Sequence, residues 1–141
     1  MSDWLDAEHR EQTLALLGDL GLSYVCVDEP QGFASSVPPV VAVTAPLAFA
    51  RFHGRNAAMW EERTQTASER FDYYYRPEEL DEWVPRIQQL ASESDELHLV
   101  INTNNFEKTT FEISFQFELT TNRENHNSRV TWIHMGVLIF D

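Results

Sequence analysis

The chain is poor in lysine and in cysteine. The chain has ten basic and 23 acidic residues, which gives a formal charge of -13. Lys108 is the one lysine among the basic residues. Such an excess of negative charge repels a phosphate backbone, so nucleic acid is disfavoured as a partner. The single cysteine, Cys26, has no partner for an internal disulfide and lies in the apolar run 24–27. We expect it to be a buried small hydrophobic residue.

The sequence also lacks long apolar segments, and its first residues do not resemble a signal peptide. No run of eighteen apolar residues occurs, and the first eight residues have neither a basic start nor an apolar core. We therefore expect no membrane contact and a cytoplasmic location.

Motifs that define metal, phosphate and hydrolase sites are missing as well. The five histidines show no His-x-x-x-His spacing, and neither a phosphate-cradling glycine loop nor a Gly-x-Ser-x-Gly element occurs. The sequence thus predicts no metal site and leaves any cofactor unknown.

Short apolar runs alternate with helical patterns through the first 105 residues. Strands are expected at 22–27, 47–52 and 97–101, because these runs are almost continuously apolar, as in parallel strands covered on both faces. Helices are expected at 6–20, at 57–69 and from Pro77 to Ala91, the last with a kink at Pro85. Strands separated by helices indicate an α/β fold with a parallel sheet.

The composition changes after residue 105. Proline and alanine are absent from there on, and apolar residues alternate with polar ones over 111–119. This alternation is typical of a half-exposed strand, and 129–141 reads as another, so a β-hairpin is the simplest prediction. We divide the chain into 1–105 and a divergent β-rich tail, 106–141.

Several segments resemble one known family. They are Tyr24 to Pro30, the element Arg51-Phe52-His53-Gly54-Arg55 with Trp60 beyond it, Arg70-Phe71-Asp72-Tyr73, Pro77 to Leu80, and Asn104-Asn105. In this order and spacing they are similar to the C-terminal portion of the YecE-like family, domain of unknown function 72, over roughly residues 8–105. The resemblance implies a TIM barrel with no established activity.

A complete eight-stranded barrel takes roughly 250 residues, so a chain of 141 supplies only part of one. We therefore expect a truncated TIM barrel. Two functions remain open: a small-molecule enzyme or binder, and a non-catalytic remnant or interaction module that self-associates through open sheet edges.

Polar residues follow the predicted strands directly. Asp28, His53, Asn104 and Asn105 should emerge at one rim, where TIM-barrel enzymes assemble their sites, although turn geometry also places such residues at strand ends. His53 and Asp28 are the catalytic candidates. His53 can act as a general base or a hydrogen-bond donor, or it can bond a nearby carbonyl and fix the turn at Gly54.

Two arginines and a tyrosine run complete the candidates for ligand binding. Arg51, inside a buried strand, needs a negatively charged partner, which can be the carboxylate of Asp28 or Glu29 or an anionic ligand. Arg55 can bind a phosphate or carboxylate with its fork, or can be a solvated surface residue. Tyr73, with the two tyrosines after it, can form an aromatic wall or pack onto the rim.

Overall fold

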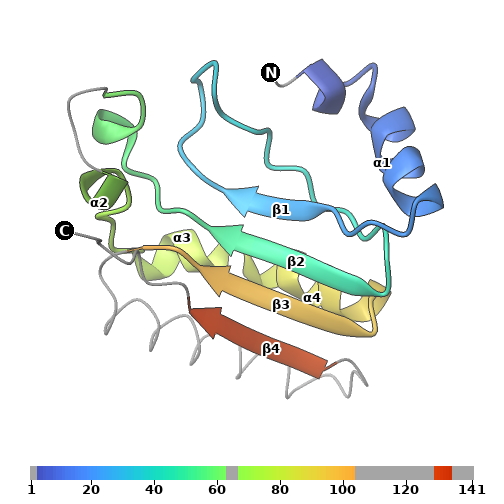
Figure 1. Cartoon of the computed structure of the whole chain (residues 1–141). Helices are drawn as coiled ribbons and strands as arrows, with labels where there is room; N and C mark the ends of the chain where they lie inside the picture. The colour runs from blue at the N-terminus through green and yellow to red at the C-terminus, as the bar shows by residue number, and fades with distance from the viewer. Residues whose placement is uncertain (1–2, 63–66, 104–128, 135–141) are drawn as a thin grey trace.

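A sheet of parallel strands organises the chain. The structure is a computed structural model, and it describes residues 3–62, 67–103 and 129–134. Four strands lie in the order β1-β2-β3-β4, and each pairs in parallel with the next (Figure 1). Their bounds are Val25–Asp28, Leu47–Phe52, Glu96–Ile101 and Arg129–His134. The α/β class and the parallel strands predicted from the sequence are confirmed.

Short helices connect the strands. The α-helices are α1 (Arg10–Asp19), α2 (Ala67–Arg70), α3 (Pro77–Asp81) and α4 (Val84–Glu93), and the 3-10 helices are η1 (Asp3–Leu5) and η2 (Ala57–Met59). Figure 1 shows α3 and α4 behind the sheet, between β2 and β3 in the chain. None of the described helices has the length and apolar character needed to cross a membrane.

One face of the sheet, which we call the helix face, carries the core. Alternate residues of β2 and β3 on this face are buried against α3 and α4, and Phe52 meets the Trp83 ring at 4.9 Å between centroids. Helix α4 contributes Ile87, Leu90 and Ala91, which recur at helical spacing and are at most 2% exposed. Cys26 is fully buried in the same core, as the sequence predicts.

The opposite face, which we call the open face, is only partly covered. Leu47, Phe49 and Arg51 alternate with the buried residues of β2, and each is half-buried. The prediction that this strand is covered on both faces is therefore wrong. Leu47 and Phe49 nevertheless continue the apolar run on the face that α4 does not cover.

Two helix predictions need correction. The segment expected as one helix over 57–69 contains η2 and α2 instead, with 63–66 outside the described residues. The kink expected at Pro85 is a complete break, because Pro85 lies in the first turn of α4 rather than inside a longer helix. Proline suits that position, where its missing N–H has no helical partner.

The tail contributes a strand. Residues Arg129–His134 form β4, within the predicted range 129–141, and they pair in parallel with β3. The predicted partner in a hairpin, 111–119, lies outside the described residues.

Candidate functional site

The carboxyl ends of β1, β2 and β3 meet at one edge of the sheet. Backbone hydrogen bonds extend the ladder there: the His53 N–H donates to the Asp28 carbonyl, and the Asn102 N–H donates to the Phe52 carbonyl, both at 2.9 Å. The common rim expected for Asp28 and His53 is therefore present. The strand register nevertheless sends their side chains to different faces, because Asp28 is paired with Phe52 of the helix face and His53 follows Arg51 by two residues.

Asp28 is a buried acceptor on the helix face. Its carboxylate is 4% exposed and accepts hydrogen bonds from Tyr75 Oη, from Trp83 Nε1 at 2.8 Å, and from Nε and a terminal nitrogen of Arg55 at 3.0 and 2.8 Å. These donors engage both carboxylate oxygens. A carboxylate held in this way has little capacity left for a substrate proton, and the contacts favour a structural role for Asp28.

Arg55 is not the solvated surface residue that we considered. Its fork is closed on Asp28, and the same terminal nitrogen lies 2.9 Å from Oε2 of Glu82. The Arg55 side chain is 23% exposed, whereas that of Glu82 is 52% exposed. The Arg55 guanidinium thus bridges the buried Asp28 and the exposed Glu82. Asp28, rather than an external anion, is the carboxylate that the Arg55 fork binds.

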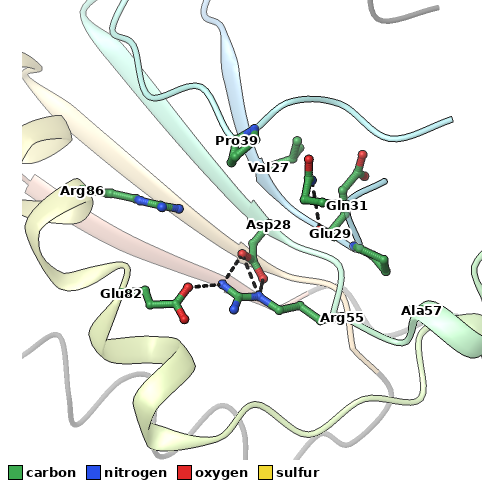
Figure 2. A pocket seen from close by; sticks show the side chains of 10 residues that line it. Val27, Asp28, Glu29, Gln31, Pro39, Arg55, Ala57, Glu82 and Arg86 are labelled. Atoms are coloured by element: carbon green, nitrogen blue, oxygen red, sulfur yellow. Dashed lines mark hydrogen bonds and ion pairs between the residues drawn. The ribbon is translucent and has the colours of Figure 1, made fainter. Parts of the chain in front are cut away.

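A pocket of about 340 Å³ opens beside this ion-pair network. Figure 2 shows the bonds of Asp28, Arg55 and Glu82 on its wall, with Arg86 reaching toward the same space. The guanidinium of Arg86 lies 5.0 Å from the centroid of the Trp83 ring. Three carboxylates, of Asp28, Glu29 and Glu82, and two guanidiniums line the pocket, so its lining does not favour an anion.

His53 belongs to a different group, on the open face. Its Nδ1 lies 3.2 Å from Nδ2 of Asn102, and its ring lies 5.6 Å from Phe71 and 6.3 Å from Trp60 between centroids. Burial, reinforced by the positive charge of Arg51, lowers the pKa of His53 to about 4, although Asp28 opposes the shift. The imidazole is therefore neutral at pH 7. The ring contacts Asn102 rather than the carbonyl that we considered.

Arg51 and Trp60 carry buried donors without acceptors. Arg51 Nε and Trp60 Nε1 are both inaccessible to solvent, and neither has a hydrogen-bond partner. The pair expected between Arg51 and Asp28 or Glu29 is wrong, since Arg55 holds Asp28 and Glu29 accepts from the backbone N–H of Val37. Arg51 is in register with Val27 and Val100 instead. In the described part of the chain no carboxylate pairs with this cation.

Tyr73 packs at the rim, which is one of the two roles that we considered for it, the other being part of an aromatic wall for a ligand. Its hydroxyl donates to Glu79, and its ring meets that of Tyr75 edge to face at 5.3 Å. Tyr75 is fully buried, and its hydroxyl accepts from the Gly54 N–H at 2.9 Å. These contacts fix the turn after β2 and give Tyr73 a packing role.

The sequence did not identify two members of the open-face group, Asn102 and Trp60. The predicted Asn104 and Asn105 lie outside the described residues, whereas Asn102 follows β3 directly. Strand parity is the signal that would have found Asn102, because it continues the alternation of His98 and Val100. Trp60 comes from a loop, and no local pattern indicates that it reaches His53. Among the described residues there is no group of three or more His, Cys, Asp or Glu that could hold a metal ion.

The parallel sheet with a half-buried open face and a group of donors at its carboxyl edge is the architecture of part of a TIM barrel. Comparison with known proteins agrees with this class. The model of the family described as protein of unknown function DUF72 matches residues 1–132, and the chain belongs to this family. The resemblance to the YecE-like family is thereby confirmed. The match includes most of β4, and the division of the chain at residue 105 stays a prediction.

Relatives of known sequence and structure are about twice as long as this chain, or longer. The chain is 30% identical over 105 residues to the UPF0759 protein YunF of Bacillus subtilis, which is 72% of this chain and 37% of that protein. A DUF72 family protein of Enterococcus faecalis, EF0366, superposes with a TM-score of 0.74 at 28% identity, over 86% of this chain and 44% of the other.

The DUF72 family protein TM1631 of Thermotoga maritima gives a TM-score of 0.67 at 30% identity, covering 80% of this chain and 42% of the other. The chain thus spans less than half the length of these relatives, and the predicted fold class of a partial TIM barrel is confirmed.

Proposed function

We propose that the carboxyl edge of the open face binds a small molecule through Arg51, His53 and Asn102. The observation that carries the proposal is the pair of buried, unpartnered donors, Arg51 Nε and Trp60 Nε1. Buried polar groups in folded proteins are nearly always hydrogen-bonded, and an unsatisfied one calls for an acceptor from outside the chain. The location supports the same conclusion, since TIM-barrel proteins assemble their sites at this edge.

His53 fits this proposal better as a donor than as a base. With a pKa of about 4 it takes up a proton poorly at neutral pH. If the Asn102 amide donates to Nδ1, the imidazole proton resides on Nε2, and Nε2 has no partner among the described residues. A neutral imidazole with a free N–H can polarise a ligand oxygen, as neutral histidines do in other enzymes. A catalytic step is not part of the proposal.

A screen of small polar molecules, neutral and charged, against ¹⁵N-labelled protein tests it. We expect the hits to shift the backbone amides of 51–53 and 100–102 and the side-chain amide of Asn102. Arg86, which lines the other pocket, provides the control: its neighbours at the start of α4 should not move. Shifts confined to α4 and to residues 29–31 would place the site in the pocket of Figure 2 and overturn the proposal.

An interaction module is the second candidate. Trp4, Leu16 and Leu20 are 69%, 58% and 61% exposed, although they are large apolar residues, and α1 has no buried residue. Self-association would cover them. Light scattering at several protein concentrations tests this function, and a monomer at all of them would count against it. A cytoplasmic location remains an expectation from the sequence.

A further inference from the structure

The open-face site is rich in donors and poor in acceptors. Arg51 supplies a guanidinium, Trp60 an indole N–H, and neutral His53 an imidazole N–H, whereas no carboxylate pairs with any of them among the described residues. The two acids at the end of β1 are engaged elsewhere: Asp28 turns to the helix face, and Glu29 accepts from Val37. A ligand that reaches these groups therefore meets hydrogen-bond donors rather than acceptors.

Resting on the proposed function, we propose that the ligand of this site carries an oxyanion, a carboxylate or a phosphate. Arg51 binds it by charge and by its forked N–H groups, and the indole of Trp60 and Nε2 of His53 add single hydrogen bonds. Only an acceptor with several lone pairs satisfies three donors at once. An anion also neutralises Arg51, a cation whose Cα partners in the sheet are Val27 and Val100.

The overall negative charge of the protein disfavours nonspecific binding of anions. At -13 the protein repels anions at long range, so an anion that binds must do so through local contacts rather than through general attraction. The neutral state of His53 is due mainly to burial, and the positive charge of Arg51, which also attracts an anion, lowers the pKa of His53 further.

Titration with inorganic phosphate, and separately with acetate, tests the inference at pH 7 and constant ionic strength. The reporters are the indole N–H signal of Trp60, assigned with Trp60→Phe, and the Nε–H signal of Arg51. We expect both signals to shift with one saturable curve for at least one of the two anions. Arg51→Gln should weaken binding by about 10- to 100-fold, the range for losing a charged hydrogen bond.

Matched variants separate the contributions of Arg51 and His53 to the affinity for the anion. Arg86→Gln removes an arginine outside the site and should leave the affinity unchanged. His53→Gln keeps an N–H donor and should bind within a few-fold of the wild type, whereas His53→Leu should bind more weakly. Arg51→Lys, which keeps the charge but not the fork, should show intermediate affinity and covers the case in which Arg51→Gln does not fold.

The outcomes distinguish the two proposals. If neutral molecules shift residues 51–53 but neither anion does, the oxyanion inference is wrong and the proposed function stands. If neither kind of molecule acts there, both are wrong. A linear, unsaturable shift that persists in Arg51→Gln would also overturn the inference, because it would show only the general effect of salt.

Discussion

Replacing Asp28 by asparagine should strongly destabilise the fold. The carboxylate accepts from Arg55, Tyr75 and Trp83 and is 4% exposed. Asparagine keeps one carbonyl oxygen but puts an N–H₂ group where the other oxygen faces a donor. Arg55 then retains only the exposed Glu82 as an acid partner. Removing one partner of a buried ion pair costs ~3–5 kcal/mol, and the partial exposure of Arg55 places our expectation near ~3 kcal/mol.

Urea denaturation at pH 7, followed by circular dichroism, measures this change. Glu82→Gln is the matched control, because it removes the other acid of Arg55 at a side chain that is 52% exposed. That pair should contribute at most ~1 kcal/mol. Equal losses for Asp28→Asn and Glu82→Gln, or a loss below ~0.5 kcal/mol for Asp28→Asn, would refute the view that Asp28 organises this edge of the core.

Two further predictions follow from the turn after β2. The NMR titration of His53 should give a pKa of about 4; because this lies below the ordinary value of 6.5, the unfolded state binds more protons between these values. Stability due to His53 should be complete above pH 6.5 and fall by up to ~3 kcal/mol toward pH 4, and His53→Gln should lack this component in urea denaturation. Gly54→Ala should destabilise by ~2 kcal/mol or more in the same assay, since φ is +84° and a Cβ would lie 2.5 Å from Tyr73 Cβ. Gly21→Ala, at φ +67° with open space, should cost only ~1 kcal/mol, and equal losses would count against the steric argument.

The strands were predictable because their signal is local. The apolar run 47–52 has the bounds of β2, and the run 97–101 differs from β3 by one residue. The order of strands and helices then indicates parallel pairing. The break before α4 was harder, since a kinked helix and two short helices share one apolar stripe. What separates them is that Pro85 lies in the first turn of α4, where no helical hydrogen bond is lost.

The partners of the site residues were not predictable from local patterns. Arg51 and Arg55 both follow Asp28 in the chain and lie four residues apart, so the sequence alone does not say which of them binds it. In the structure Arg55 binds Asp28, whereas the strand register places Arg51 beside Val27. The donors that complete the Asp28 cluster, Tyr75 and Trp83, are 47 and 55 residues away in the chain. Such contacts depend on how α3 and α4 dock on the sheet.

Arg51 has no carboxylate partner in the described part of the chain, and this leads to a last prediction, that Arg51→Leu makes the free protein more stable. Leucine would pack beside Val27 and Val100 and would remove the buried Nε–H that has no acceptor. Relieving such an unsatisfied donor should raise the free energy of unfolding by ~1 kcal/mol. A gain in stability on losing a site residue is expected where function requires a strained group.

The same urea denaturation, repeated with added anion, tests whether Arg51 binds a ligand. Phosphate or acetate, if it occupies the site, should stabilise the wild type against urea in proportion to its saturation, and should have no such effect on Arg51→Leu. Arg86→Leu, outside the site, should keep the anion effect. A loss of stability in Arg51→Leu without added anion would mean that the guanidinium already has a partner in the folded chain, and the reasoning that leads from Arg51 to a ligand would fail at its first step.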